Sequence, residues 1–506
     1  MSGQSCRVQR FCKPRPDLQL GGNVSTSHLI GIDIGTTSVK AVMIDLSGQR
    51  VAEFSARYPT QRPAAGQVEQ DPEDWLRLVR AALEQFAHHG SAAALCLTSQ
   101  VNTHVFTDAA LNVLHPAIVW QDGRAAQAGA TLDRAVSAEN KIAWLGAPIP
   151  IDASHALARM AWMQAARPEI WDRTAHVLLP RDWVLARLTG VLLTDPISAV
   201  GLVTPTFAYA DDLIAGLNGA ARRLAPLADP FAVVGQVNTD WPFAETPVVL
   251  GVMDAWASLF GLGVAQEGEA FYLSGTSDVL GIISGDLFPQ PGIITFPDWR
   301  GLRLHAAPTQ SGGASLDWAA RLLGRSAQDL ATMAISVTDG APLFLPHLQG
   351  ERAPLWDAAS RGGFAGLTAS HGPAEMAASI LEGVAFSARL AFEALERSAG
   401  AKPTILRAGG GGFASDTWAQ LRADVLGRPI QRVEGSDPGA IGAAVMAGVG
   451  VGSMTDLASA SSALVKDDRM FTPRPRESTH ADTRYALWCD LYGALRPINH
   501  ALNALG

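Results

Sequence analysis

Residues 29–45 read L-I-G-I-D-I-G-T-T-S-V-K-A-V-M-I-D, and the rest of the chain is organised around this stretch. Two runs of β-forming residues flank a Gly-Thr-Thr-Ser turn, which predicts a strand, a tight turn and a returning strand. Gly35 lets the backbone come close to a ligand. The hydroxyl groups of Thr36, Thr37 and Ser38, with the neighbouring N–H groups, can form a concave cluster of donors for an anion. The turn therefore suits a phosphate group.

Asp33 lies at the end of the first predicted strand, beside that anion site. A carboxylate next to a phosphate is electrostatically unfavourable unless a divalent cation lies between the two groups. The stretch therefore indicates a nucleotide with Mg²⁺, and an ordinary hairpin is the alternative interpretation.

The composition of the chain is that of a globular protein with large cores. Its 506 residues are 48% hydrophobic and 17% charged, which predicts two or more substantial domains. The net charge of -9 and the lack of a run rich in Lys and Arg argue against binding to nucleic acid. We therefore expect the partner to be a small molecule.

The cysteines and the apolar segments bear on the compartment. Cys6, Cys12, Cys96 and Cys489 are scattered and show no paired spacing for a metal, which suits a reducing compartment, so the cytoplasm is the expected location. No long uninterrupted apolar segment is present, so no membrane association is expected. Residues 1–27 lack the apolar core of a signal peptide and are predicted to be a mobile tail.

Elements of an α/β fold follow the first hairpin. Asp71 and Pro72 open a predicted amphipathic helix that should pack on the first sheet. Residues 92–98 are a predicted buried strand, and the polar stretch 99–104 follows it. Polar side chains at the end of a buried strand are where an open α/β sheet places its ligand contacts.

A pentad W-Q-D-G-R occupies residues 120–124. One interpretation is a capped turn with an ion pair at the surface. The other is a sugar site, because Trp120 offers an apolar face for stacking, and Asp122 and Arg124 can pair with several hydroxyl groups.

Asp254 is the only charged residue in the apolar run 248–263, which predicts a buried strand followed by a helix of small and apolar residues. An acid between a strand and a helix can be an N-cap. The functional interpretation is a base that takes the proton of a sugar hydroxyl as that hydroxyl attacks a γ-phosphate.

Residues 270–285 read A-F-Y-L-S-G-T-S-D-V-L-G-I-I-S-G and repeat the strand, Gly-Thr-Ser turn and strand of the opening stretch. Two such hairpins, one in each half of the chain, can hold a triphosphate from both sides, with Thr36 and Thr276 as matched donors. The repeat predicts one domain over residues 28–246 and a second over residues 247–506.

Glycine-rich segments mark the second half. Residues 407–416 contain four consecutive glycines, which cost chain entropy, so a surface for an adenine or ribose ring is favoured over a flexible linker. Ser415 is predicted to cap the helix that follows. A helix of small residues over 439–448 should pack closely on a sheet, and residues 482–503 are a predicted amphipathic helix.

Taken in order, these motifs resemble the FGGY family of carbohydrate kinases, and its xylulokinases most of all. The resemblance covers nearly everything from residue 28 to the end and is carried by G-I-D-I-G-T-T-S-V-K, W-Q-D-G-R, G-V-M-D, L-S-G-T-S, L-Q-G-E-R-A-P-L-W-D and G-G-G-F-A-S-D-T-W-A-Q-L-R-A-D. The resemblance implies an α/β fold with two ribonuclease H-like domains of the actin and hexokinase type. It also implies that these domains close over ATP, Mg²⁺ and a sugar in a central cleft.

The resemblance assigns roles to residues. It implies Asp254 as the catalytic base, which also contacts the substrate, and Asp33 as the carboxylate that reaches the metal through water. The implied nucleotide contacts are Thr36, Thr37, Ser38, Lys40, Gly275, Thr276, Gly313, Gly411, Gly412 and Ser415. The implied sugar contacts are Gln100, Val101, Asn102, Trp120, Asp122 and Arg124.

Two departures from the family pattern lie on the sugar side. Asn102 stands where many xylulokinases have His, and Ala255 stands where the family usually has an amide side chain. An amide reaches less far than an imidazole and does not titrate. Changes of this kind alter discrimination between related substrates, whereas the phosphate and adenine motifs are intact.

The expected activity is ATP-dependent phosphorylation of a ketopentose, most of all D-xylulose, and a homodimer is compatible with the sequence. Ribulose, erythritol, gluconate and glycerol are the alternative substrates. An actin-like or chaperone-like ATPase is an alternative of another class, although it has no use for the Trp-Asp-Arg pentad. A sugar-sensing regulator is a further alternative, although the N-terminal tail is too short for a DNA-binding module. A Walker P-loop is excluded because no Gly-Lys dipeptide occurs.

Overall fold

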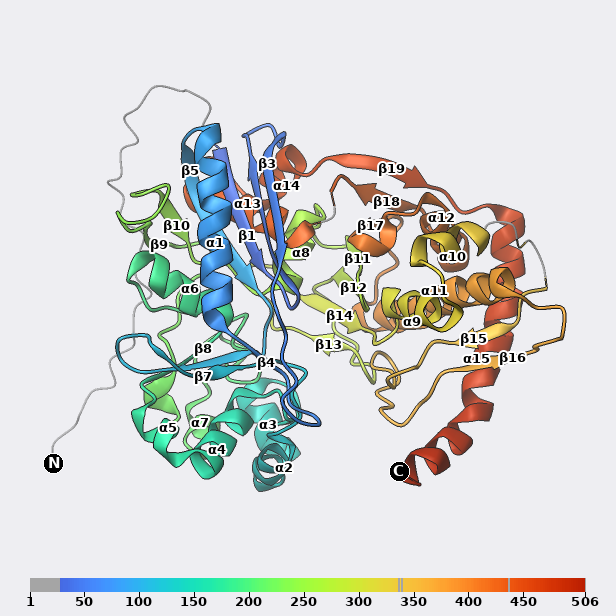
Figure 1. Cartoon of the computed structure of the whole chain (residues 1–506), viewed down its shortest axis with the longest axis horizontal. Helices are drawn as coiled ribbons and strands as arrows, with labels where there is room; N and C mark the ends of the chain where they lie inside the picture. Colours follow the sequence, from blue (N-terminus) through green and yellow to red (C-terminus); the bar gives the residue numbers. More distant parts are fainter. Residues whose placement is uncertain (1–27, 335–336, 338–339, 436, 506) are drawn as a thin grey trace. The chain divides into compact units, whose positions relative to one another are not determined.

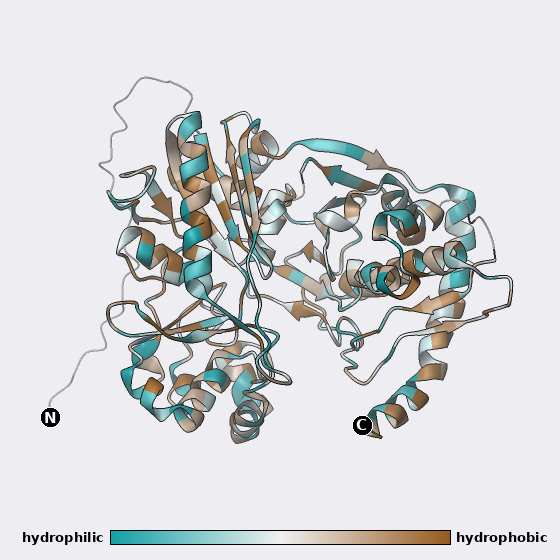
Figure 2. Cartoon of the chain, in the orientation of Figure 1, coloured by the Kyte–Doolittle hydropathy of each residue, from teal (hydrophilic) through white to brown (hydrophobic). Residues whose placement is uncertain are grey.

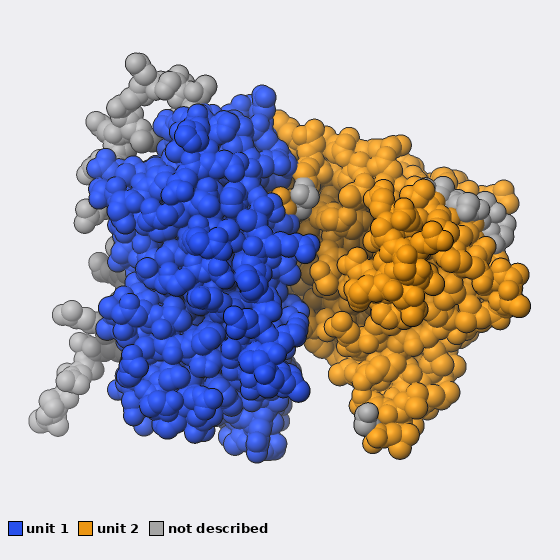
Figure 3. Space-filling view, viewed as in Figure 1, with its two compact units in different colours: residues 1–257, 439–464 blue, residues 258–438, 465–506 orange. Residues whose placement is uncertain are grey.

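The computed structural model describes residues 28–334, 337, 340–435 and 437–505, so the predicted mobile tail, residues 1–27, lies outside the described residues. The chain divides into two compact units (Figure 3). Unit 1 comprises Met1–Ala257 and Gly439–Leu464, and unit 2 comprises Ser258–Pro438 and Val465–Gly506. No helix of the described residues is long and apolar enough to cross a membrane.

The main sheet of unit 1 has the strand order β3-β2-β1-β5-β10-β9 in the described chain. Its strands are β1 (His28–Ile34), β2 (Ser38–Ile44), β3 (Arg50–Arg57), β5 (Ala92–Ser99), β9 (Val233–Gln236) and β10 (Pro247–Val249). The first three strands form an antiparallel meander, and β5 and β10 run parallel to β1. Most residues of β1 are buried, because helices cover both faces of the sheet (Figure 1).

Helix α1 (Pro72–Phe86) covers one face of this sheet. Asp71 is its N-cap and accepts a hydrogen bond from the N–H of Glu73, as the sequence predicted. Its buried side chains include Trp75, Val79 and Leu83, and hydrophilic and hydrophobic bands alternate along the helix in Figure 2. The amphipathic pattern of the sequence therefore describes the packing of this helix.

The rest of unit 1 completes the region beside the sheet. A smaller sheet has the order β4-β7-β6-β8. Its strands are β4 (Glu69–Gln70), β6 (His104–Thr107), β7 (Val113–Ile118) and β8 (His176–Leu178). The further helices are η1 (Ala87–His89), α2 (Ala126–Ala135), α3 (Ala138–Leu145), α4 (Ala156–Ala166), α5 (Pro168–Arg173), α6 (Pro180–Thr189), α7 (Asp211–Ile214), η2 (Ala221–Arg223) and α14 (Leu457–Leu464).

Helix α13 (Pro438–Gly450) lies against β1 of unit 1 although its sequence comes late in the chain. A Cβ atom added to Gly31, in the middle of β1, would lie 1.9 Å from the carbonyl oxygen of Ala440. The helix and the strand therefore touch through their backbones, which only small residues permit. The predicted close packing of this small-residue helix is confirmed.

The sheet of unit 2 has the strand order β13-β14-β12-β11-β17-β18-β19. Its strands are β11 (Ala270–Ser274), β12 (Asp278–Ile283), β13 (Ile294–Thr295), β14 (Leu304–Pro308), β17 (Leu406–Gly409), β18 (Ile430–Val433) and β19 (Asp467–Phe471), and a separate pair is β15 (Leu343–Leu345) with β16 (Gly363–Ala365). The helices are α9 (Gly313–Leu323), α10 (Ala327–Ala334), α11 (Pro373–Ala399), η3 (Gly411–Phe413), α12 (Asp416–Leu426) and α15 (Pro475–Ala504).

The two units repeat one topology. The order β3-β2-β1-β5-β10 of unit 1 matches β14-β12-β11-β17-β18 of unit 2, and the strand directions match as well. In both units an antiparallel strand follows at the far side, β9 or β19. The predicted internal repeat and the two-domain α/β fold are confirmed.

The structure divides the chain differently from the predicted boundary between residues 246 and 247. Strand β10 pairs with β5, through Val248 opposite Leu95, so it completes the sheet of unit 1. Helix α8 (Asp254–Gly261) begins in unit 1 and ends in unit 2. Because α13 also returns to unit 1, the chain passes between the units at two further places, before α13 and after α14.

Candidate active site

The first Gly-Thr loop joins β1 to β2. The N–H of Gly35 donates to the carbonyl oxygen of Ser38 at 3.1 Å, which closes the turn. The hydroxyl of Tyr58 donates to the carbonyl oxygen of Gly35 and holds the loop from the sheet side. Thr37 is exposed and Thr36 is half-buried, whereas Ser38 is buried at the start of β2. Of the three predicted phosphate contacts, the two threonines are the accessible ones.

Asp33 ends β1 between two residues that have no side chain. Its Oδ2 lies 3.8 Å from the position of a Cβ on Gly35 and 2.6 Å from that of a Cβ on Gly439, so both glycines leave room for the carboxylate. Burial raises the pKa of the Tyr58 hydroxyl, and the charge of Asp33 raises it further. Lys40 lies opposite Asp33 on β2.

The donor set at Asp33 suits Mg²⁺ bound together with a nucleotide. Among the described residues, no group of three or more His, Cys, Asp or Glu side chains is arranged to hold a metal ion by itself. Mg²⁺ is commonly held by one or two carboxylates and takes its other ligands from phosphates and water. A single carboxylate beside a phosphate-sized loop fits this pattern.

A closed ring of hydrogen bonds joins the Gly-Thr loop to the predicted sugar residues. The indole N–H of Trp120 donates to Thr36 Oγ1 at 3.0 Å. The amide of Gln70 donates to the carbonyl oxygen of Thr36 at 2.7 Å and accepts from Gln100 at 2.9 Å. Gln100 accepts from Thr103 Oγ1 at 3.0 Å, and that hydroxyl accepts from the N–H of Trp120 at 3.1 Å. The position of the loop is thereby linked to that of the Trp120 ring.

Gln70 and Thr103 have no counterpart among the residues that the sequence singled out. Gln70 is buried on β4, just before the helix-capping Asp71, and only its side chain connects it to the loop. Thr103 is likewise buried. A buried polar residue beside a predicted ligand segment is the signal that could have found both.

Asp122 and Arg124 form a buried ion pair within the pentad, not the surface pair of the structural interpretation. Arg124 Nη2 lies 2.8 Å from Asp122 Oδ2, and Arg124 Nη1 lies 2.7 Å from Glu69 Oε1. Asp122 also accepts the N–H of Val68 at 2.5 Å. These contacts fix the turn that carries Trp120.

Asn102 adopts a left-handed backbone conformation, with φ of 58°, and borders a cavity of about 40 Å³ in unit 1. His104 Nδ1 and Ser198 Oγ belong to cavity-lining residues, are buried, and have no hydrogen-bond partner among the described residues. Burial lowers the pKa of His104 well below its ordinary value, so the ring is neutral. The predicted sugar contact therefore lies next to a polar hollow of a few water volumes.

Asp254 is the first residue of α8 and not its N-cap, so the capping interpretation is wrong. Its side chain is half-buried, and burial raises the pKa of the carboxyl to about 6. Oδ1 accepts the N–H of Ala255 at 2.8 Å. A carboxylate with a pKa close to neutral is suited to accept a proton from a substrate.

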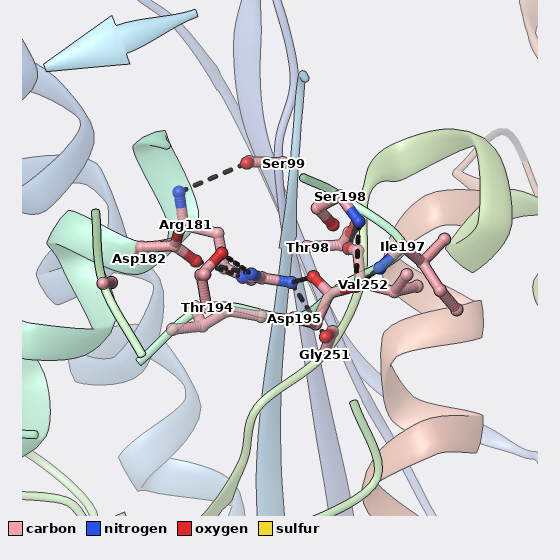
Figure 4. A network of polar contacts seen from close by, with 12 residues as sticks. Thr98, Ser99, Arg181, Asp182, Thr194, Asp195, Ile197, Ser198, Gly251 and Val252 are labelled. Atoms are coloured by element: carbon pink, nitrogen blue, oxygen red, sulfur yellow. Dashed lines mark hydrogen bonds and ion pairs between the residues drawn. The ribbon is translucent and has the colours of Figure 1, made fainter. Parts of the chain in front are cut away.

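A buried ionic network holds the segment that leads to Asp254 (Figure 4). Arg181 lies between two carboxylates, with Nη2 2.5 Å from Asp182 and Nη1 2.6 Å from Asp195. Nη1 also donates to the carbonyl oxygen of Gly251 at 2.8 Å, three residues before Asp254. Burial lowers the pKa of the Arg181 guanidinium, but the two carboxylates outweigh burial and raise the pKa above its ordinary value.

The same network reaches the end of β5. The N–H of Arg181 donates to Ser99 Oγ at 3.2 Å, and Thr98 Oγ1 donates to the carbonyl oxygen of Val252 at 2.5 Å. Ser99 immediately precedes Gln100. The network therefore ties the predicted sugar segment of β5 to the segment before the predicted base.

The second Gly-Thr loop, in unit 2, is built against the start of α9. The N–H of Gly275 donates to the carbonyl oxygen of Ser277 at 3.0 Å, which closes the turn. The N–H of Gly313 donates to Gly275 at 2.9 Å and that of Ala314 donates to Thr276 at 3.0 Å. A Cβ on Gly313 would lie 2.7 Å from the carbonyl oxygen of Gly275, so glycine is required there.

Packing accounts for three of the four consecutive glycines. A Cβ would lie 2.7 Å from Leu262 at Gly409, 2.4 Å from the carbonyl oxygen of Ser274 at Gly410, and 2.0 Å from Ser274 Oγ at Gly412. At Gly411 a Cβ would meet nothing within 4 Å. The side-chain-free surface predicted for a nucleoside therefore narrows to Gly411.

The predicted nucleotide residues of unit 2 are brought together by these contacts. Ser415 caps α12 and accepts the N–H of Trp418 at 3.4 Å, as predicted. The members of this cluster are Gly275, Thr276, Gly313, Gly411, Gly412 and Ser415. Unit 1 holds the other cluster, with Asp33, Thr36, Thr37, Ser38, Gln100, Val101, Asn102, Trp120 and Asp254.

Comparison with known proteins identifies relatives of the whole chain. The family model for the N-terminal domain of the FGGY family of carbohydrate kinases matches residues 28–261, and the model for the C-terminal domain matches residues 271–451. The xylulose kinase of Klebsiella pneumoniae is 30% identical over 486 residues, which cover 93% of this chain and 99% of that protein. Crystal structures of a ligand-bound xylulose kinase and of a gluconate kinase, both from Lactobacillus acidophilus, each match with a TM-score of 0.84 at 27% identity, covering 93% of this chain and 98% of theirs.

Proposed function

Because the chain belongs to the FGGY family of carbohydrate kinases, we propose that it transfers the γ-phosphoryl group of ATP to a hydroxyl group of a ketopentose, with D-xylulose as the first candidate. The product would be D-xylulose 5-phosphate. Relatives named xylulose kinase support this choice of sugar.

The observation that carries the proposal is Asp254, an acid at the start of α8 whose pKa burial raises to about 6. Near neutral pH the carboxylate is ionised and can accept the proton of the attacking hydroxyl. Phosphoryl transfer needs little more from the protein than a positioned acceptor, a base and stabilisation of charge. Asp254 supplies the base.

The Gly-Thr loops supply the phosphate contacts in this proposal. Thr36 and Thr37 of unit 1 and Gly275 and Thr276 of unit 2 offer hydroxyl and N–H donors at tight turns. Asp33 would hold Mg²⁺ through water, and the metal would neutralise charge on the phosphate oxygens when bound. The two loops orient the phosphate chain and leave the terminal phosphoryl group to the acceptor.

The sugar side of the proposal rests on Trp120 and Asn102. The hydrogen bond to Thr36 fixes the Trp120 ring, whose face can stack on the apolar face of a sugar. Asn102 offers an amide for a hydroxyl group. Because a gluconate kinase matches the chain as well as a xylulose kinase does, ribulose, erythritol, gluconate and glycerol are the alternative acceptors.

The test is ADP release with ATP and Mg²⁺ over a panel of xylulose, ribulose, erythritol, gluconate and glycerol. We expect xylulose to give the highest kcat/KM. Asp254→Asn should lower kcat by roughly 10²- to 10⁴-fold, because it removes the base, and should leave the Kd for ADP unchanged. Turnover that is retained in this variant would remove Asp254 from its role, and ADP release that is independent of any acceptor would favour an ATPase.

A further inference from the structure

Arg422 of α12 is fully buried in unit 2 and carries a charge that the proposed reaction does not use. Its guanidinium carbon lies 4.0 Å from the ring centroid of Trp418, 4.5 Å from that of Phe413 and 5.0 Å from that of Tyr272. Aromatic rings stabilise a cation through their faces. A cavity-filling residue at this place would need neither the charge nor the aromatic surround.

The guanidinium joins two separate segments of the chain. Nη2 donates to Ser274 Oγ at 2.8 Å, and Nη1 donates to the carbonyl oxygen of Gly412 at 2.8 Å. Ser274 immediately precedes the predicted phosphate contacts Gly275 and Thr276. Gly412 belongs to the glycine-rich segment predicted to contact the nucleoside. One planar group with fixed donor directions therefore sets the separation of the two segments.

A buried carboxylate completes the arrangement. Asp278 lies 3.7 Å from Arg422 Nη2 and accepts the hydroxyls of Ser274 and Tyr272, each at 2.6 Å. Burial raises the pKa of Asp278, and the charge of Arg422 opposes this rise. The Ser274 hydroxyl thus accepts from the arginine and donates to the aspartate, which leaves it a single orientation.

We propose that Arg422, backed by Asp278, is a positioning residue that holds the Gly-Thr loop and the glycine-rich segment of unit 2 in register for one nucleotide. The proposal rests on the proposed kinase function. It requires that loss of the guanidinium weaken the nucleotide contact specifically, whereas a purely structural role would only lower stability.

The experiment compares Arg422→Met with the double variant Arg422→Met/Asp278→Asn and with Arg422→Lys. Replacing both charged partners avoids leaving one buried charge unpaired, so the double variant should keep a melting temperature near that of the wild type. ADP binding is measured by calorimetry without sugar, and KM is measured separately for ATP and for the acceptor. We expect the Kd for ADP and the KM for ATP to rise at least about tenfold in the double variant, because a small misplacement of binding groups is costly.

Arg422→Lys keeps the charge but cannot donate from two fixed directions, so ADP binding should weaken in this variant too. The KM for the acceptor should stay within about twofold in all three variants. Arg223→Met is the matched control, because Arg223 is also buried against a tryptophan, Trp171, and donates to backbone carbonyl groups without touching either segment. This control should lose stability and keep its affinity for ADP.

The outcomes separate the two proposals. A wild-type protein that binds no ADP contradicts the proposed function itself. A wild-type protein that binds ADP, together with a folded double variant that binds it equally well, overturns the role of Arg422. Equal increases in KM for ATP and for the acceptor also overturn it. If the double variant does not fold, the lysine variant decides, since unchanged ADP binding there contradicts the proposal.

Discussion

Asp254 illustrates how much a single environment can change the chemistry of one residue. Most carboxyl groups titrate near pH 4, but burial at the start of α8 raises the pKa of this one to about 6. The shift favours the protonated form. The carboxyl therefore changes from acid to base within the range in which metabolic enzymes work.

The pH dependence of the reaction should report this carboxyl. A base acts only when it is deprotonated, so kcat/KM should be level above about pH 7 and fall by about tenfold for each pH unit below about pH 6. The measurement is ADP release at saturating ATP and limiting sugar in a series of buffers. A profile that stays level down to pH 5 would contradict the assignment of Asp254 as the base.

Trp120 acts through the ring of hydrogen bonds at the level of a single side chain. Trp120→Phe keeps an aromatic face but removes the donor to Thr36 Oγ1. A hydrogen bond of this kind contributes about 1 kcal/mol, so the KM for ATP should rise by about fivefold together with that for the sugar. Kinetics with each substrate varied in turn provide the measurement.

Trp183→Phe is the control for this prediction. Trp183 is buried in unit 1 and donates its indole N–H to the carbonyl oxygen of Leu111, outside the ring of hydrogen bonds. This variant should alter neither KM. If Trp120→Phe changed only the KM for the sugar, the proposed link to the Gly-Thr loop would be wrong.

At the scale of elements, the contact between α13 and β1 is the tightest constraint on unit 1. The backbone of Ala440 occupies the space that a side chain at Gly31 would need. Glycine in a strand weakens the strand itself, so its presence here is explained by the helix that lies on it.

Gly31→Ala should lower the free energy of unfolding by about 3 kcal/mol, because neither backbone can move without disturbing its own element. Urea denaturation followed by circular dichroism measures the change. Gly493→Ala is the matched control: this glycine lies in the exposed part of α15, and a Cβ there meets nothing within 4 Å. That variant should gain up to about 1 kcal/mol. Equal stabilities of the two variants would contradict the packing argument.

The hairpins show what local sequence can predict at this scale. Both Gly-Thr turns lie between strands that the β-forming residues marked, and both were predicted with nearly the observed bounds. The pairing of β10 with β5 was not predictable in the same way. Strand β10 is short and apolar, and nothing in its residues states which sheet it completes.

At the scale of the whole molecule, the repeated topology was visible in the sequence because the turn residues recur. The residues that support the loops were not, because their partners are distant in sequence. Arg181 reaches Gly251 across 70 positions, and Arg422 reaches Ser274 across 148. A buried arginine has no local pattern of its own, so only the folded chain identifies it as a support for a site.

The composition of unit 1 from two separated pieces has a consequence for biosynthesis. Strand β1 leaves the ribosome early, whereas α13, which covers Gly31, is encoded near the end of the chain. Translation must therefore reach nearly to β19 and α15 before the first sheet acquires its last covering helix. A nascent or truncated product that stops before residue 438 exposes a bare backbone groove along β1, which makes it a target for chaperones and proteases.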